Sequence, residues 1–186
     1  MDSVLDAIRR RYACRSFAAD PVPPELLQKV VEAGLRAPSG RDRQPWRIIA
    51  VTNPERVAEL ETAGLEALRQ LDPKGHADIV ARGGRLLYGA PVVLLVARLD
   101  LPGKGTEIDT GVVVAHLLLA ATELGLATCP NRMLGKLFQT DQGPDFERRL
   151  GFPEGFEYGL GILLGYAAEA PRQPHQPDFS KFIEIA

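Results

Sequence analysis

The chain has 186 residues and a mass of 20.3 kDa, the size of one ordinary domain. Its 22 Lys and Arg side chains nearly balance 24 Asp and Glu side chains, and the net charge of −2 excludes the broad basic surface of a general nucleic-acid binder. The first residues carry no pattern of a secretory leader, and no apolar run reaches the roughly 20 residues that a membrane span needs. We therefore expect a cytoplasmic protein that binds neither nucleic acid nor a membrane.

Apolar periodicity predicts helices and strands that alternate along the chain. Helices are predicted over residues 4–11, 24–37, 54–71, 110–124 and 144–150, and strands over residues 47–52, 91–97, 158–164 and 181–185. Residues 75–84 are too weakly patterned to assign. Asp2 and Ser3 are expected to cap the first helix, and Asp109 the helix over residues 110–124, which is apolar nearly all round and must therefore be buried. The interleaving indicates one α+β or α/β domain without an internal linker.

Arginines are concentrated where the first helix is expected to end. Arg9, Arg10, Arg11 and Arg15 lie within seven positions of a chain that is acidic overall. The planar guanidinium group matches phosphate oxygens, so a bound phosphate group is one interpretation of this cluster, and a solvated helix end is the other.

A second candidate region is the irregular segment over residues 37–47, where Pro, Ser and Gly separate a helix from a strand. It contains Trp46, the only tryptophan of the chain. The indole ring either helps to wrap a bound ring system or packs into the core at the start of the strand. The segment alone does not decide between these two interpretations.

Two enzyme motifs fail on spacing. Gly159, Gly161 and Gly165 miss the dinucleotide fingerprint by one residue and lie in a predicted strand, so no Rossmann unit is expected. No serine lies in the G-x-S-x-G turn of a hydrolase.

Metal and disulfide chemistry are not indicated either. His76, His116 and His175 have no metal-ligand spacing, so no metal site is predicted, and His116 is interpreted as a core histidine. Cys14 and Cys129 match no CxxC pattern and are expected to be two free thiols.

Four segments together resemble the FMN-dependent nitroreductase family: RRRYACRSF, APSGRDRQPWRIIAV, APVVLLVA and DTGVVVAHLLLAATELGLATCP. Their order and spacing agree over nearly the whole chain, and the TCP form resembles the branch that includes nitrobenzoate reductases. The resemblance implies one nitroreductase-like FMN-binding domain over residues 1–186, an α+β fold with a mixed, mainly antiparallel sheet flanked by helices. It also implies a domain-swapped homodimer in which a C-terminal strand completes the partner's sheet.

The resemblance places non-covalent FMN between the two protomers. Arg11 and Arg15 would hold its phosphate, with Tyr12 and Ala13 between them. Ala13 stands where the family often has a serine, so one side-chain hydrogen bond is expected to be missing.

Three further groups of residues follow from the same resemblance. From the partner protomer, the flavin would be contacted by Pro38, Ser39, Gly40 and Asp42, the last in place of a common asparagine. The turn against the pyrimidine and N5 edge of the flavin would comprise Pro130, Asn131, Arg132 and Met133. Near the C-terminus, Arg172 or His175 would replace the usual cation pair at the phosphate.

A cation beside flavin N1 is the remaining expected contact. Arg85 matches that position, with Arg82 as the alternative. A reduced flavin carries negative charge at N1, so a fixed cation there favours reduction.

The implied activity is NAD(P)H-dependent, FMN-mediated reduction of a small-molecule acceptor by a ping-pong mechanism. No side chain acts as a nucleophile, because the flavin carries the chemistry. The acceptor is a nitroaromatic, a quinone or an activated alkene. The alternatives are a flavoenzyme of the same fold with dehalogenase, flavin-cleaving or dehydrogenase chemistry, and a non-catalytic flavin store or sensor.

Overall fold

The computed structural model describes residues 4–99, 101, 105–171 and 173–185. The expected caps Asp2 and Ser3 and the candidate ligand Arg172 lie outside the described residues. Four strands form one antiparallel sheet in the order β1-β2-β4-β3. They are β1 (Trp46–Val51), β2 (Val92–Leu99), β3 (Ala127–Asn131) and β4 (Phe156–Gly165).

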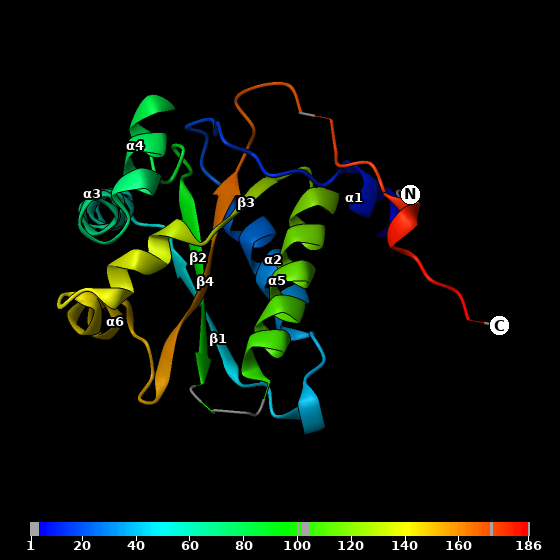
Figure 1. The fold of residues 1–186 in the computed structure, drawn as a ribbon. Helices are drawn as coiled ribbons and strands as arrows, with labels where there is room; N and C mark the ends of the chain where they lie inside the picture. The colour runs from blue at the N-terminus through cyan, green and yellow to red at the C-terminus, as the bar shows by residue number, and fades with distance from the viewer. Residues whose placement is uncertain (1–3, 100, 102–104, 172, 186) are drawn as a thin grey trace.

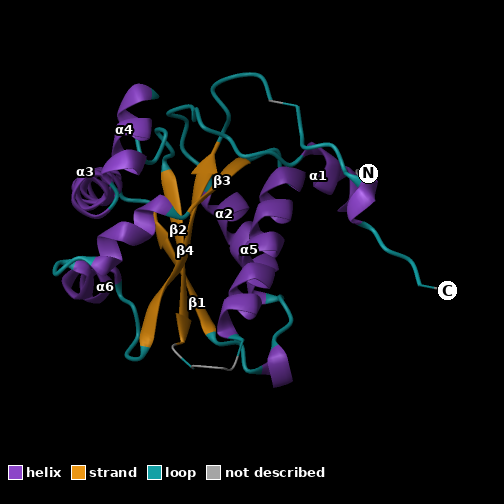
Figure 2. Cartoon of the chain, in the orientation of Figure 1, coloured by secondary structure: helices purple, strands orange, loops and turns teal. Residues whose placement is uncertain are grey.

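Helices cover both faces of this sheet (Figures 1 and 2). One layer contains α3 (Pro54–Leu71), α4 (Pro73–Ala81) and α6 (Gly143–Leu150), and the other contains α2 (Pro24–Leu35) and α5 (Thr106–Glu123). The short α1 (Val4–Arg10) packs against α5. Three 3₁₀ segments complete the fold: η1 (Gly40–Asp42), η2 (Met133–Gln139) and η3 (Phe179–Lys181). The α+β architecture with a mainly antiparallel sheet is thus confirmed.

The sheet separates two hydrophobic cores. Leu60, Leu68 and Leu134 are fully buried on the α3 side, and Val30 and Leu117 on the α5 side. The central strand β2 is buried on both faces along its apolar run, as a continuous apolar segment predicts.

Trp46 belongs to the α5-side core. Its side chain is only 2% exposed, so the core interpretation is right and the ring-wrapping interpretation is wrong for this residue within one chain. His116 is half-buried, and its Nδ1 lies 3.1 Å from the carbonyl oxygen of Ala33, so it has a partner, although it is less buried than predicted. Cys14 and Cys129 are both free thiols, as predicted, and both are buried.

Helix α5 begins earlier than predicted. Its first residue is Thr106 and its N-cap is Gly105, whose φ of 72° is the left-handed conformation that favours glycine. Asp109 is therefore not the cap but a residue of the first turns, and it is buried. None of the helices in the described part of the chain is long and apolar enough to cross a membrane.

Apolar periodicity in the sequence did not predict two of the elements. Residues 73–81 form α4, which begins at Pro73 and is capped by the Asp72 side chain, an acceptor for the Gly75 N–H at 3.0 Å. Strand β3 contains Pro130 and lies at the edge of the sheet, where a missing N–H is tolerated. The strand was not predicted because it is short and contains a proline.

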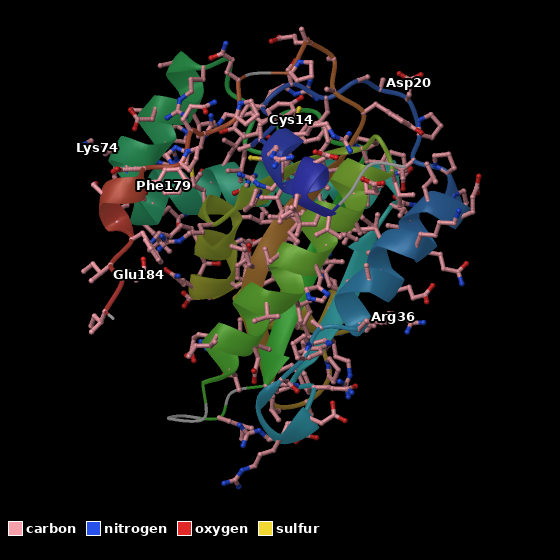
Figure 3. All side chains as sticks on the ribbon, turned by 90° about the vertical axis from the view of Figure 1, so that its right-hand side faces the viewer. Cys14, Asp20, Arg36, Lys74, Phe179 and Glu184 are labelled. Carbon is pink, nitrogen blue, oxygen red and sulfur yellow. The ribbon has the colours of Figure 1, made fainter. Side chains whose placement is uncertain are left out.

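The predicted last strand is absent from the described residues of this single chain. The C-terminal segment contains η3 and then continues without a strand. Ile183 and Ile185 are 81% and 92% exposed, and the segment projects from the α1 side of the molecule, where Figure 3 labels Phe179 and Glu184. A strand needs a neighbouring strand to bond with, and this segment finds none within its own chain.

Candidate functional site

The segment after α1 crosses one end of the sheet. Ala13 forms a parallel bridge with Thr128 of β3, and the N–H of Cys14 donates to the Thr128 carbonyl oxygen at 2.8 Å. Further along, Phe17 forms an antiparallel bridge with Ala167, just beyond β4. These backbone bonds on both sides fix where the side chains of residues 11–17 lie.

Three arginines line a depression of about 360 Å³ beside this segment. Arg15 comes from the segment itself, Arg82 from the C-terminal end of α4, and Arg85 from the loop that follows. Tyr12 forms part of the wall, and among the described lining residues only Glu169 is acidic. We call this depression the arginine pocket.

The arginine pocket has uncompensated positive charge. Within the described ranges, no carboxylate forms an ion pair with Arg15 or Arg85. Arg82 donates from Nε to the Asp78 carbonyl oxygen at 3.0 Å, and its Nη2 lies 3.9 Å from the Asp78 carboxylate. Clustered guanidinium groups without carboxylate partners favour a bound anion, and their planar forks suit phosphate.

Arg11 lies on the same side of the molecule although it does not line the arginine pocket. Burial raises the pKa of the Cys129 thiol, and the nearby charges of Arg15 and Arg11 act in the opposite direction. Both arginines are near enough to influence the pKa of this thiol. The structure brings together Tyr12, Arg15, Arg82 and Arg85, and Ala13 lies beside them in its bridge to Thr128.

Residues 130–133, which were predicted to form a turn, are divided between a strand and a 3₁₀ segment. Pro130 and Asn131 are still part of β3, and the chain turns only at Arg132, which precedes η2. Asn131 is 5% exposed, so its side chain is a structural group within the chain. Arg132 is exposed and lines a separate depression of about 300 Å³ with Tyr158, and Met133 packs on the α3-side core.

The loop with Pro38, Ser39, Gly40 and Asp42 lies far from the arginines. The Gly40 N–H donates to the Asp109 carboxylate at 3.1 Å, at the start of α5, whereas Arg10 pairs with Glu123 at the end of α5. The rise of 1.5 Å per residue puts about 20 Å between these two ends. Figure 3 shows Cys14 near the top of the view and Arg36, which precedes the loop, well below it. Within one chain, the structure does not bring this loop to the arginines.

Among its described residues, the C-terminal segment contributes Pro171, Gln173 and Pro174 to a depression beside Tyr12. His175 is exposed and lines neither depression beside Tyr12. A further depression of about 400 Å³ is lined by Tyr12 and Thr128 together with Pro171, Gln173 and Pro174. Arg172, the other predicted candidate, lies outside the described residues.

Comparison with known proteins shows the family of this chain. The model of the nitroreductase family matches residues 8–166, from α1 to just beyond β4. The chain belongs to the nitroreductase family. Its relatives include an NADH dehydrogenase of Thermus thermophilus, which is 43% identical over 203 aligned positions that cover 98% of this chain and 95% of the relative. An NADPH-flavin oxidoreductase of Vibrio harveyi is 27% identical, with 95% of this chain and 71% of the relative covered.

Solved nitroreductases share the fold. A crystal structure of a nitroreductase with bound FMN from Desulfitobacterium hafniense superposes with a TM-score of 0.94 at 38% identity and covers all of both chains. A nitroreductase with bound FMN from Bacteroides fragilis gives a TM-score of 0.86 at 26% identity, again over both whole chains.

Sequence reasoning missed Glu61, which positions the arginine pocket of this nitroreductase, and it named Asn131 as a flavin contact without this positioning role. Glu61 of α3 accepts the N–H groups of Leu86 and Leu87, at 2.5 and 2.8 Å. From the other side, Asn131 donates from Nδ2 to the Leu86 carbonyl oxygen at 2.8 Å. The loop after Arg85 is therefore held from both α3 and β3.

A signal for Glu61 was present in the sequence. Glu61 lies four residues from both Val57 and Leu65, so it is an acidic side chain on the inward face of a predicted helix. A carboxylate in that position needs donors from elsewhere in the fold. The donors themselves, two backbone N–H groups, leave no trace in the sequence.

Proposed function

We propose that this nitroreductase binds FMN without a covalent link and uses NADH or NADPH to reduce a small organic acceptor. The observation that carries the proposal is the arginine pocket, where Arg15, Arg82 and Arg85 converge without carboxylate ion pairs strong enough to neutralise them. The bound FMN of two solved relatives supports the choice of anion. Names of relatives that refer to NADH and to NADPH support a nicotinamide donor.

The residues present fit a flavin phosphate. Arg15 lines the pocket together with the polar side chains of Tyr12 and Ser16, and Arg11 lies four residues before Arg15 in the chain. The side chain of Thr128, which is bonded through its backbone to Cys14, has a buried hydroxyl without a partner among the described residues. A dianionic phosphate would neutralise two of the arginines.

Residue roles follow the chemistry of each group. Arg11 and Arg15 bind the phosphate, Tyr12 and Ala13 line its approach, and Arg85 supplies a cation to the pyrimidine edge, with Arg82 as the alternative. FMN, when bound, takes two electrons from the nicotinamide and passes them to an acceptor in a ping-pong sequence. The chain itself binds, orients and excludes water.

The backbone at the end of β3 is proposed to border the flavin. Pro130 and Asn131 would shape that border, and Arg132 and Met133 would offer their backbone N–H groups. His175 or Arg172 would complete the phosphate site from the C-terminal segment.

A homodimer is part of the proposal, because the loop with Pro38, Ser39, Gly40 and Asp42 reaches a flavin only from a second copy. Apolar side chains left exposed in one chain support this. They lie on α1 and on the C-terminal segment, and include Val4, Leu5, Ile8, Phe182, Ile183 and Ile185. The edge strand β1 has a free side to which the partner's C-terminal segment would add. Residues 1–186 are proposed to form one FMN-binding domain of a cytoplasmic protein.

Anaerobic reduction tests the enzymatic assignment. The FMN-loaded protein is mixed with NADH or NADPH without oxygen, and flavin absorbance is followed. We expect rapid bleaching, followed by recovery when a quinone or a nitroaromatic is added. Flavin that stays oxidised would favour a flavin store or sensor. Bleaching that neither acceptor class reverses would favour a flavoenzyme of the same fold with other redox chemistry.

A further inference from the structure

Asp109 has no role in the proposed flavin chemistry, yet it is a buried acid on α5. Its side chain is 7% exposed, and Oδ1 accepts the Gly40 N–H at 3.1 Å. The second oxygen, Oδ2, is buried without a hydrogen-bond partner among the described residues. Burying a polar oxygen without a partner costs free energy, so stability of the helix does not explain an aspartate here.

The loop that Asp109 contacts has an unusual backbone. Arg41, Asp42 and Gln44 have φ values of 57°, 52° and 47°, in the left-handed region that non-glycine residues rarely adopt. Such residues cost free energy and persist only where surrounding contacts hold them. Within the loop, the Gln44 N–H donates to Ser39 Oγ at 2.9 Å.

The C-terminal end of this loop is anchored differently from its middle. At the C-terminal end, the chain enters the core at Trp46, which is 2% exposed. Gly40, in the middle, is exposed, and its N–H is tied to α5 by Asp109. The hydrogen bond thus joins a strained, exposed loop to the first turns of a buried helix.

We propose that Asp109 is a positioning residue that holds the loop over residues 39–44, with its three left-handed residues, by accepting the Gly40 N–H. Through this bond it presents Ser39 and Gly40 to the flavin of the partner protomer. The second statement rests on the proposed function, whereas the first concerns the loop alone and is tested without FMN.

Two variants break the same hydrogen bond from opposite sides. Asp109→Ala removes the acceptor, and Gly40→Pro removes the donor. Proline suits this position, because Gly40 begins η1 and Ser39 before it is extended, with φ −143° and ψ 160°. Since Gly40 is exposed, Gly40→Pro leaves the core intact even if Asp109→Ala fails to fold.

Two further variants keep the hydrogen bond. Asp109→Asn retains an oxygen that can accept the Gly40 N–H. Gly40→Ala retains the N–H, and its added Cβ would meet only the flexible end of Arg43, with Nη2 at 3.2 Å. Comparing Gly40→Pro with Gly40→Ala isolates the N–H group in the exchange experiment.

The first readout is hydrogen–deuterium exchange of the FMN-free protein over residues 38–45. We expect faster exchange in Asp109→Ala and Gly40→Pro, and wild-type exchange in Asp109→Asn and Gly40→Ala. The double variant Asp109→Ala/Gly40→Pro should exchange no faster than either single variant, because both remove one interaction. Wild-type exchange in both Asp109→Ala and Gly40→Pro, or fast exchange in Asp109→Asn, would overturn the positioning role.

The second readout is the Kd for FMN, measured by fluorescence titration. We expect Asp109→Ala to raise it about tenfold, which corresponds to about 1.4 kcal/mol, and Asp109→Asn to restore it. Asn53→Ala, which removes the side-chain cap of α3, controls for general loss of stability and should leave the Kd unchanged.

The outcomes distinguish the two parts of the proposal, that Asp109 holds the loop and that the loop is thereby presented to the flavin. A freed loop with an unchanged Kd would refute presentation to the flavin. An equal rise in Kd for Asn53→Ala would reduce Asp109 to a structural role and overturn the proposal. A wild-type protein that binds no FMN would refute the proposed function, and the exchange experiment would still decide whether Asp109 holds the loop.

Discussion

At the scale of single residues, Arg11 and Arg15 are the proposed ligands of the FMN phosphate. We expect the double variant Arg11→Ala/Arg15→Ala to lose bound flavin, because each charge-assisted hydrogen bond to phosphate contributes roughly 1.5–3 kcal/mol. The measurement is the ratio of flavin to protein after gel filtration. Full flavin content in this variant would show that the phosphate is held elsewhere.

A matched control removes two arginines outside the site. Arg36 and Arg69 are exposed and pair with Glu32 and Glu66 on their own helices. The variant Arg36→Ala/Arg69→Ala changes the net charge by the same amount, and exposed pairs contribute little to stability. It should keep its flavin.

Arg85 and Arg82 are distinguished by their effect on the flavin potential. Both line the arginine pocket, and Arg82 has Asp78 as a weak partner, whereas Arg85 has no carboxylate partner among the described residues. We expect Arg85→Met to lower the two-electron potential by roughly 30 mV for each 1.4 kcal/mol of lost stabilisation. Potentiometry that finds the potential lowered in Arg82→Met and unchanged in Arg85→Met would reassign the cation.

At the scale of elements, Asn131 joins the end of β3 to two neighbouring segments. Its Nδ2 donates to the Leu86 carbonyl oxygen, and its Oδ1 accepts the Leu134 N–H at 3.1 Å. Asn131→Ala leaves both buried groups unsatisfied, at a cost of about 1–3 kcal/mol each. We expect a clear loss in urea unfolding at fixed protein concentration, much larger than for the exposed cap variant Asn53→Ala. Equal losses in the two variants would contradict this role.

The contact between α3 and α6 should make stability depend on pH. A hydrogen bond from Arg149 holds the pKa of Glu59 below its ordinary value of 4.5. A carboxyl with a lowered folded-state pKa stabilises the fold above its unfolded pKa, and this contribution disappears as pH falls through the folded pKa. We expect thermal stability to fall below about pH 4.5, with a smaller fall in Glu59→Gln. The same pH dependence in both proteins would exclude Glu59 as a source.

At the scale of the whole molecule, the exposed apolar side chains predict an obligate homodimer. Val4 and Leu5 of α1 are 70% and 60% exposed, and Phe182 in the C-terminal segment is 68% exposed. Burying them between two copies requires an interface above roughly 2,000 Å², the size typical of obligate pairs. Light scattering at micromolar concentration should find dimers only. A monomer that retains FMN would contradict both the dimer and the shared site.

Deleting residues 177–186 tests the contribution of the C-terminal segment to that dimer. Within one chain, the described part of this segment forms no strand, so its removal should leave the core of the protomer intact. We expect the truncated protein to dissociate at concentrations where the full chain is dimeric. Unchanged dimer stability would show that the segment does not add to the partner's sheet.

The sequence by itself determined most of the elements, because apolar periodicity acts locally. Helix α3 runs from Pro54 to Leu71 as predicted, with Asn53 as its cap. The continuous apolar run of β2 predicted a central strand, and the clustered arginines predicted an anion site. Each of these signals is carried by residues that lie near one another in the chain.

Only the tertiary structure decided which distant residues meet. Arg85 lies near Arg15 because Glu61 and Asn131 hold the loop that follows Arg85. Both bind backbone groups of that loop, and such backbone partners have no sequence signature. Asp109 was predicted to cap a helix, since an aspartate before an apolar run is typical of a cap, yet the helix begins at Thr106 and leaves the carboxylate for the Gly40 N–H. Such partners are fixed by packing across the fold, which local pattern does not encode.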